Sequence, residues 1–233
     1  MTCGKGGDLS KWINTGYDYI VGFYKYQDSI INYEDGIYKR AYNMKYNSKS
    51  KKKFPHMIFE QADAGKNYLN GNAFLNTEKN NIGHDIIKCI TGRDYDKGYK
   101  RVLSNFEGIA KDGFDVISNQ FSIHYFFENI ETLTGFIQNI SESCKNGGYF
   151  IGTCFDGKTL FNKLRKKTTI SYNSGSHKIF EINRKYEDND DFLDNDKKSL
   201  GYAIDVYMES IGIKTKEYLV NFDYFTSIMK LYG

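Results

Sequence analysis

Short apolar runs alternate with amphipathic stretches along this chain, which predicts an α/β protein. The apolar runs are typical of buried strands and fall at residues 19–23, 56–62, 114–118 and 149–154. Apolar positions with helical spacing are found in residues 8–16, 27–46, 97–111, 131–145 and 157–167. Because strands and helices alternate, the pattern predicts a sheet with helices on both faces.

The last third of the chain has a different pattern. Residues 179–186 and 202–211 alternate between apolar and polar positions, as strands with one exposed face do, and the acidic segment EDNDDFLDND separates them. A further strand begins at residue 217, and a terminal helix follows it. Residues 67–91 show no regular period, and residues 48–53 form a basic loop. A chain of 233 residues can bury one sizeable core, so we expect one domain.

The composition of the chain excludes several kinds of site and partner. The net charge of +3 is too small to indicate a nucleic-acid partner by itself. The four cysteines are scattered without a CxxC pair, so they indicate no zinc site and no disulfide framework, and a reducing compartment fits them. No apolar run approaches the roughly 20 residues that span a bilayer. We therefore expect a soluble intracellular protein without a membrane partner.

The segment FDVISNQFSIHYFFEN, residues 114–129, carries the most chemical information. Asn119, Gln120, His124 and Tyr125 follow a predicted buried strand, where an α/β sheet usually opens its ligand crevice. Polar and aromatic side chains at that place suit a flat aromatic substrate such as a nucleobase. An isolated His-Tyr pair more often simply packs at the start of a helix. The rest of the chain has to decide between these interpretations.

Four separated motifs occur in one order and decide in favour of a ligand site: CGKGGDLSKW at residues 3–12, FDVISNQFSIHYFFEN, GGYFIGT at 147–153 and EYLVNF at 217–222. Together they resemble the mRNA cap guanine-N7 methyltransferases, and viral capping enzymes are the most similar. The resemblance covers nearly the whole chain. It implies a Rossmann-like class I methyltransferase sheet, S-adenosylmethionine as cofactor and capped RNA as substrate, with other capping-enzyme domains or subunits as candidate partners. The corresponding location is the host cytoplasm or virion for a viral protein and the nucleus for a cellular one.

The reaction implied by this resemblance needs no general base. N7 of guanine carries a free lone pair, so its attack on the methyl group of S-adenosylmethionine releases no proton. The main requirement is to align the nitrogen, the methyl carbon and the departing sulfur and to exclude water. We therefore expect no catalytic residue, and His124 need not act as a base.

The resemblance assigns cofactor-binding roles to residues in three places. Small side chains at Gly4, Gly6 and Gly7 let the backbone approach the cofactor, and Lys5 can pair with its carboxylate. Asp63 is placed to accept a hydrogen bond from the adenine amino group, and Gln120 to line the methionine portion. The alternatives are an ordinary glycine turn and polar residues that cap or turn the chain at the surface.

The resemblance also assigns a guanine pocket. Phe121, His124 and Tyr125 would supply aromatic faces and an imidazole hydrogen bond, and Glu217 would accept from guanine N1 and the amino group. A carboxylate there also favours the positive charge that the base gains on methylation. The alternative for Glu217 is a solvated charge at a strand edge.

Basic residues could contact the cap triphosphate or the following RNA, because basic side chains neutralise phosphates without reading sequence. Arg40 alone has a match in the family. Solvated charge runs are the simpler interpretation for two groups: Lys49, Lys51, Lys52 and Lys53, and Lys163, Arg165, Lys166 and Lys167.

The sequence departs from the family pattern in ways that affect the cofactor side. A complete first strand with an acidic residue would precede the glycine turn, and an acidic residue would end the second strand, where Tyr24 stands here; Asp28 comes a turn later. We therefore expect a domain over residues 1–233 that is truncated at both ends and lacks the first strand. Two alternatives to an active enzyme follow: a degenerate methyltransferase-like binding or stimulatory subunit of a capping complex, and a methyltransferase for another nucleobase or small molecule.

Overall fold

The computed structural model describes residues 1–47, 53–74, 82–187 and 191–233. These residues form two compact units. The first unit holds Met1–Asn119 and Gln138–Ile151, and the second holds Gln120–Ile137 and Gly152–Gly233. Each unit has a hydrophobic cluster of its own. No helix of the described residues is long and apolar enough to cross a membrane.

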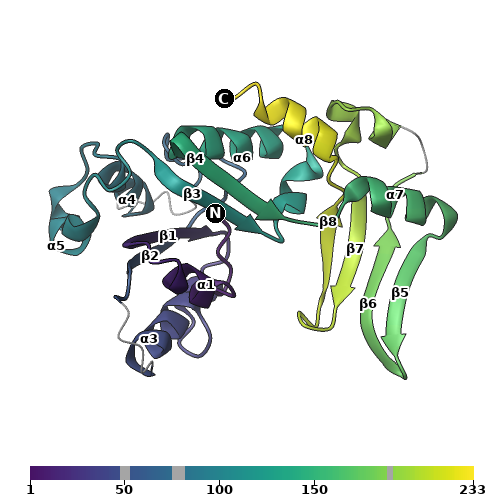
Figure 1. The fold of residues 1–233 in the computed structure, drawn as a ribbon, viewed down its shortest axis with the longest axis horizontal. Coiled ribbons are helices and arrows are strands. Elements are labelled where there is room, and N and C mark those ends of the chain that lie inside the picture. Colours follow the sequence, from purple (N-terminus) through teal and green to yellow (C-terminus); the bar gives the residue numbers. More distant parts are fainter. Residues whose placement is uncertain (48–52, 75–81, 188–190) are drawn as a thin grey trace. The chain divides into compact units, whose positions relative to one another are not determined.

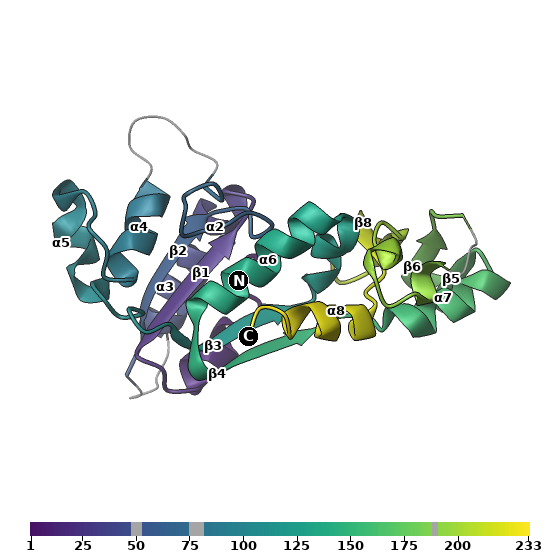
Figure 2. The same cartoon turned by 90° about the horizontal axis from the view of Figure 1, so that it is seen from above.

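The first unit begins with a pair of parallel strands and the helices between them. Its elements up to residue 103 are α1 (Leu9–Asn14), β1 (Tyr19–Tyr24), α2 (Asp28–Ile31), α3 (Ile37–Asn47), β2 (His56–Gln61), α4 (Ile82–Ile90) and α5 (Lys100–Leu103). Strands β1 and β2 lie side by side in parallel, from Tyr19 opposite His56 to Tyr24 opposite Gln61 (Figure 1, Figure 2). Parallel strands need a crossover connection, which α2 and α3 provide. The buried cluster beside β1 and β2 consists of Cys3, Leu9, Ile30, Ile37, Ala41 and Phe59.

A second two-stranded sheet consists of β3 (Phe114–Gln120) and β4 (Cys144–Thr153), and α6 (Ile130–Ser143) connects them. Within the first unit, Thr2 and Cys3 connect β1 to β3. The Cys3 N–H donates to the Phe23 carbonyl over 2.9 Å, and Asn119 Nδ2 donates to Thr2 Oγ1 over 3.0 Å. Thr2 has a φ of +47°, which interrupts extended backbone at this point.

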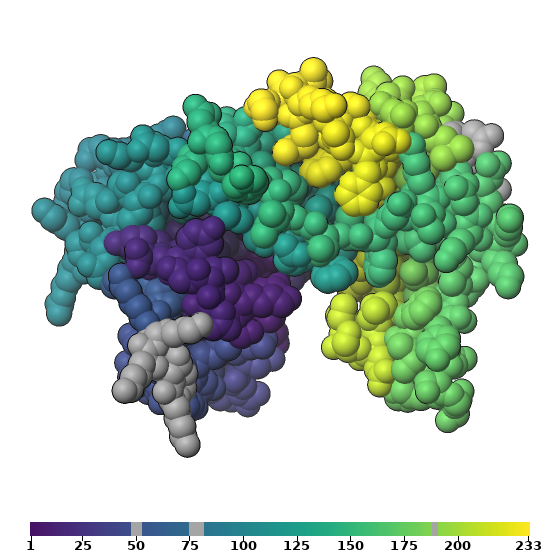
Figure 3. All heavy atoms as spheres, in the orientation of Figure 1, coloured from purple at the N-terminus to yellow at the C-terminus, as the bar shows by residue number. Residues whose placement is uncertain are grey.

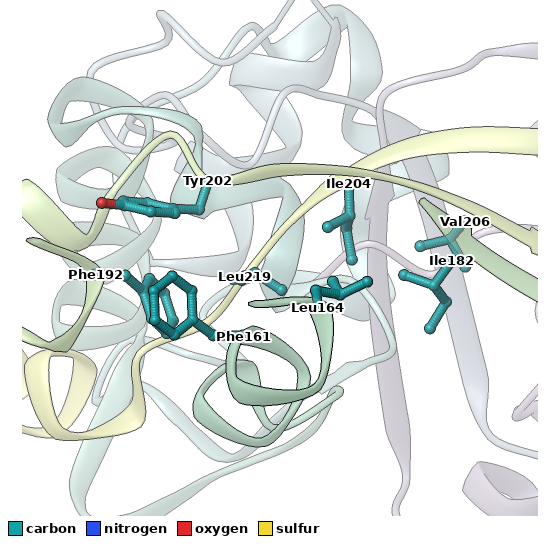
Figure 4. Close-up of a cluster of buried hydrophobic side chains, with 8 residues drawn as sticks. All are labelled: Phe161, Leu164, Ile182, Phe192, Tyr202, Ile204, Val206 and Leu219. Carbon is teal, nitrogen blue, oxygen red and sulfur yellow. The ribbon is translucent and has the colours of Figure 1, made fainter. Parts of the chain in front are cut away.

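The second unit contains an antiparallel sheet of four strands in the order β5-β6-β7-β8 (Figure 1). Their bounds are β5 (Thr169–Ser174), β6 (His177–Arg184), β7 (Ala203–Met208) and β8 (Lys214–Tyr218). Two side chains of α7 (Gly157–Lys166), Phe161 and Leu164, pack against inward residues of this sheet in the cluster drawn in Figure 4. Helix α8 (Phe222–Met229) follows β8 and is drawn in yellow at the surface of the unit in Figure 3.

The α/β class predicted from the sequence is confirmed, whereas the described strands pair in three sheets rather than one. The strands expected at residues 19–23, 56–62 and 114–118 and the helices expected at 8–16, 131–145 and 157–167 are present with end points shifted by a few residues. The strand expected from residue 217 begins earlier, at Lys214.

Two predicted helices are wrong in extent. The helix expected over residues 27–46 is broken between α2 and α3, because Asn32 Oδ1 accepts from the backbone N–H groups of Glu34 and Asp35 at 2.9 and 3.4 Å. Such a local bond offers the backbone an alternative to the helical ladder. Of the helix expected over residues 97–111, only Lys100–Leu103 is α-helical, and a 3₁₀ turn over Ser104–Phe106 follows it.

Two further expectations are wrong in part, and one strand was missed. Residues 67–91 were expected to be irregular, but α4 lies within them, and residues 75–81 lie outside the described residues. Strand β5 has a mostly exposed, polar sequence, TISYNS, so it carried no apolar alternation and was missed. The strand expected to be buried at 149–154 is present as β4, yet Tyr149 and Ile151 are 69% and 48% exposed. The basic loop at 48–52, with Lys49, Lys51 and Lys52, lies outside the described residues.

Candidate functional site

The glycine turn before α1 presents bare backbone. Gly4 and Gly6 adopt φ values of +52° and +73°, a region that favours glycine. A Cβ on Gly6 would lie 2.6 Å from the side chain of Ile37, so this glycine allows the turn to pack on the core. A Cβ on Gly4 or Gly7 would meet no atom within 4 Å. The outer side of the turn is therefore open to a ligand, while its inner side is fixed.

Two cationic side chains, those of Lys5 and Arg40, lie at this turn. Lys5 Nζ lies 2.6 Å from Asp35 Oδ2, and Arg40 Nη1 donates to the carbonyl oxygen of Lys5 over 3.1 Å. The Lys5–Asp35 pair is exposed, and exposed ion pairs contribute little because water screens them. Lys5 can therefore exchange Asp35 for another carboxylate at low cost.

Asp63 follows β2 and is held by its own neighbours. Its Oδ1 accepts from the Gly65 N–H over 3.0 Å, and its Oδ2 lies 3.2 Å from Lys25 Nζ. The backbone N–H of Asp63 donates to the Ala73 carbonyl. The carboxylate thus has a fixed direction and a cation beside it.

At the end of β1, Tyr24 stands where an acidic residue was expected. It is half-buried, and burial raises the pKa of its phenol, so the group stays neutral. Asp28, at the start of α2, accepts from Asn32 Nδ2 over 2.9 Å. Within the described residues of β1 and α2, the end of β1 therefore carries a neutral phenol where the family pattern has a carboxylate.

Sequence reasoning missed Asn139, which fixes the turn after Asp63. Its side chain is 1% exposed, donates to the carbonyl oxygens of Ala64 and Lys66 at 3.0 and 2.7 Å, and accepts from the Tyr68 N–H at 2.8 Å. A polar residue among the apolar positions of the predicted helix at 131–145 was the available signal, because buried amides have hydrogen-bond partners.

In the second unit, Gln120 and Phe121 are held by the end of β4. Gln120 Oε1 accepts from Thr153 Oγ1, and the Phe121 N–H donates to the Thr153 carbonyl, each over 2.8 Å. Phe121 has a φ of +50°, an outlier for a bulky side chain, and its ring is 65% exposed. Strained backbone and an exposed aromatic ring are features that cluster at ligand sites.

His124 and Glu217 form a buried pair. His124 lies in the 3₁₀ helix Ile123–Glu128 and Glu217 lies on β8; they are 5% and 4% exposed. His124 Nε2 is 3.5 Å from Glu217 Oε2, too far for a good hydrogen bond. Among the described residues, both ring nitrogens of His124 and Oε2 of Glu217 have no hydrogen-bond partner. Buried polar atoms of this kind are rare and require an explanation, of which a ligand is one.

Burial moves both groups of this pair toward their neutral forms. It lowers the pKa of His124 to about 4 and raises the pKa of Glu217 to about 7, the latter against a hydrogen bond from Thr215. Near neutral pH the imidazole is uncharged and the carboxyl group is divided between its two forms. Burial also raises the pKa of the nearby Cys154 thiol to about 12, so this thiol stays protonated near neutral pH.

Tyr125 completes this group at the surface. Its ring is 42% exposed and lies 4.3 Å from the ring of His124 at an angle of 65°. A flat polar ligand could contact the exposed ring of Tyr125 while its edge reaches the unpartnered atoms of His124 and Glu217. The arrangement suits recognition and positioning.

In the first unit, Gly4, Lys5, Gly6 and Gly7 lie on one turn, the Arg40 side chain reaches this turn from α3, and Asp63 follows β2. In the second unit His124 joins Tyr125 and Glu217, while Gln120 and Phe121 share Thr153. Lys163 and Lys166 lie on α7, as does Arg165, whose guanidinium contacts the ring of Phe161. Lys53 pairs with Asp18.

An α/β chain with a bare glycine turn and a buried histidine-carboxyl pair beside exposed aromatic rings is typical of proteins that bind nucleotide-like ligands. The chain belongs to the mRNA (guanine-N(7))-methyltransferase domain family, whose profile matches residues 1–233.

Two sequence relatives agree with this assignment. A probable mRNA-capping enzyme of Acanthamoeba polyphaga mimivirus is 33% identical over 227 residues, covering 94% of this chain and 17% of that protein. An mRNA cap guanine-N(7) methyltransferase of Meyerozyma guilliermondii is 26% identical, covering 100% of this chain and 37% of that protein. The chain therefore spans well under half the length of these relatives. A solved structure of the PH0226 protein from Pyrococcus horikoshii OT3 is similar at a TM-score of 0.43 with 15% identity, covering 99% of this chain and 71% of that one.

Proposed function

We propose that this chain transfers a methyl group from S-adenosylmethionine to N7 of the terminal guanine of capped RNA. The observation that carries the proposal is the buried pair of His124 and Glu217, whose unpartnered atoms suit the edge of a base. Membership of the cap methyltransferase family over residues 1–233 supports the same substrate.

The guanine would be held in the second unit. Glu217 accepts from N1 and the exocyclic amino group, His124 contributes a ring nitrogen, and Tyr125 and Phe121 offer exposed aromatic faces. The carboxylate form of Glu217 also favours the positive charge that the base acquires on methylation, so it stabilises the product side of the reaction. Catalysis rests on positioning, and no residue takes a proton from N7.

The cofactor residues would lie mainly in the first unit, and they fit the cofactor in part. S-adenosylmethionine supplies the reactive methyl group. The open space at Gly4 and Gly7 allows close approach of the cofactor to the backbone, Gly6 lets the turn pack on the core, and Lys5 can exchange Asp35 for the cofactor carboxylate. Asp63 would accept from the adenine amino group, and Gln120 would line the methionine portion. Tyr24 offers a neutral hydroxyl group to the ribose of the cofactor, whereas a carboxylate at this position would form stronger hydrogen bonds with the ribose hydroxyls.

The remaining roles concern the RNA and its surroundings. Arg40 would contact the cap triphosphate, since its guanidinium lies on the glycine turn. Other capping-enzyme domains or subunits would carry out the steps that precede methylation. The protein would act where capped RNA is made, in the host cytoplasm or virion if viral and in the nucleus if cellular. A class I methyltransferase arrangement of the strands belongs to the same proposal.

The test is transfer of labelled methyl groups from S-adenosylmethionine to GpppRNA by the purified chain. Glu217→Gln keeps the size of the side chain but removes the charge, and it should lower kcat/KM by about 10- to 100-fold, as loss of a buried charge-assisted hydrogen bond does. The chain contains a matched control, because Glu209 and His177 form an exposed pair at 2.6 Å. Glu209→Gln should leave kcat/KM unchanged. A folded wild-type chain that transfers no label would exclude the proposal.

A second candidate is a degenerate methyltransferase-like subunit that binds capped RNA or stimulates a partner. Tyr24 at the strand end favours it, because the neutral phenol is a weaker partner for ribose hydroxyls than a carboxylate. Calorimetry separates the candidates: the degenerate subunit binds GpppG without measurable affinity for S-adenosylhomocysteine, whereas the enzyme binds both.

A further inference from the structure

Thr215 has two hydrogen-bond acceptors within reach of one hydroxyl group. It lies two residues before Glu217 on β8, so both side chains project from the same face of the strand. Its Oγ1 is 3.1 Å from Glu217 Oε1 and 3.4 Å from the carbonyl oxygen of Val206, its partner in the β7–β8 ladder. A hydroxyl group has a single hydrogen and two lone pairs, so it donates well to only one of these oxygens at a time.

We propose that Thr215 is a positioning residue for Glu217, and that its hydroxyl changes its hydrogen-bond partner when Glu217 gains or loses a proton. With Glu217 ionised, Thr215 donates to Oε1. With Glu217 protonated on Oε1, the carboxyl group donates to Thr215 Oγ1, and Thr215 donates to the Val206 carbonyl. The threonine hydrogen stays on Oγ1 in both arrangements, and the proton of Glu217 is exchanged with solvent.

This exchange keeps the other carboxyl oxygen available. Oε1 is satisfied in both arrangements, so Oε2 remains directed to His124 Nε2 at 3.5 Å without a hydrogen bond. Oε2 is then the atom that would accept from guanine. The inference deepens the proposed function and rests on it for the identity of that ligand, whereas the bond between Thr215 and Glu217 is present in the protein alone.

Among the described residues, burial and the hydrogen bond from Thr215 are the causes that shift the pKa of Glu217. The titratable groups that face it are the imidazole of His124, with Tyr125 beside it, and the thiol of Cys154, which follows β4. Ile204 lies opposite it on β7. Lys216 and Tyr218 project from the other face of β8, where the Tyr218 hydroxyl donates to Glu128. Thr215 is therefore the hydrogen-bond donor that distinguishes the two forms of the carboxyl group.

The test compares Thr215→Val, which keeps the branched shape without the hydroxyl, with Thr215→Ser, which keeps the hydroxyl. The ¹³C shift of the Glu217 carboxyl carbon is followed from pH 4 to 9 in the full chain, with Glu217→Gln to assign the signal. Loss of the donor to the carboxylate should move the midpoint in Thr215→Val upward by about one pH unit, and Thr215→Ser should titrate as the wild type does. The Val206 carbonyl carbon should follow the same midpoint in the wild type and lose that response in Thr215→Val.

Identical midpoints in wild type and Thr215→Val, or a Thr215→Ser midpoint shifted as far as that of Thr215→Val, would overturn the inference. A pH profile of kcat/KM on GpppRNA provides the functional arm. Its acidic limb should move with the carboxyl midpoint in Thr215→Val. If the wild-type chain transfers no methyl groups, the proposed function fails, but the carboxyl titration still decides the role of Thr215.

Discussion

His124 and Glu217 affect the pH dependence of stability in opposite directions. Burial holds the pKa of His124 at about 4 against an ordinary value of 6.5, so the unfolded chain binds the extra proton between these values and stability rises with pH there. Burial holds the pKa of Glu217 at about 7 against an ordinary 4.5, so the folded chain binds the extra proton and stability falls with pH in that window. The two windows overlap from 4.5 to 6.5, and the effects largely cancel in the wild type.

Single substitutions should separate these two effects. Glu217→Gln removes the contribution of Glu217, which falls with pH, and leaves that of His124. The free energy of unfolding of this variant should therefore rise by up to about 3 kcal/mol between pH 4 and 6.5. His124→Asn removes the contribution of His124, which rises with pH, and leaves that of Glu217. The free energy of unfolding of this variant should therefore fall by a similar amount between pH 4.5 and 7. Urea unfolding at each pH measures both slopes. Equal slopes in the two variants would contradict the assignment of buried, neutral forms to this pair.

At the residue scale, the sequence could name candidate side chains, but it could not predict how they are held. His124, Tyr125 and Glu217 follow from motifs, but the motifs contain no information on the partner of Glu217, because Thr215 is an ordinary strand residue until β8 is paired with β7. The same holds for Lys5: its contact with Asp35 depends on the break between α2 and α3. Such contacts are tertiary and leave no local pattern.

At the scale of elements, Asn139 on α6 controls the turn that follows Asp63. Its amide satisfies two carbonyl oxygens and one N–H of residues 64–68. Asn139→Ala should lower the free energy of unfolding by about 2–4 kcal/mol, because it leaves buried backbone groups without partners. Gln138→Ala, on the same helix and partly exposed, is the control and should change it by less than about 0.5 kcal/mol. Chemical denaturation of both variants makes the comparison, and equal changes in the two variants would show that the hydrogen bonds of Asn139 to residues 64–68 contribute no stability.

Elements with strong apolar periods could be predicted, and those that depend on local polar bonds or pairing could not. Strands β1, β2 and β3 are apolar enough to be recognised from sequence. The break after α2 comes from the Asn32 side chain, and β5 is held by antiparallel pairing with β6 rather than by burial of its own residues. In both cases a specific hydrogen-bond pattern overrides the period of the sequence.

At the scale of the whole molecule, most of the candidate cofactor residues and the candidate guanine residues belong to different units. Gly4, Lys5, Gly6, Gly7 and Asp63 lie in the first unit, whereas the second unit holds the cofactor candidate Gln120 and the guanine candidates Phe121, His124, Tyr125 and Glu217. Because a bound ligand suppresses local opening, each ligand should slow amide hydrogen exchange in its own set of segments.

Hydrogen exchange followed by mass spectrometry should therefore give two distinct footprints. S-adenosylhomocysteine should slow exchange in residues 3–8 and 63–68, and GpppG should slow it in residues 122–128 and 214–218, by about tenfold or more at ligand concentrations well above Kd. The exposed hairpin of β5 and β6 serves as the internal reference and should be unaffected by either ligand. A GpppG footprint without any S-adenosylhomocysteine footprint would identify the degenerate subunit, since Tyr24 affects only the cofactor side. A GpppG footprint confined to residues outside 122–128 and 214–218 would remove His124 and Glu217 from the guanine site.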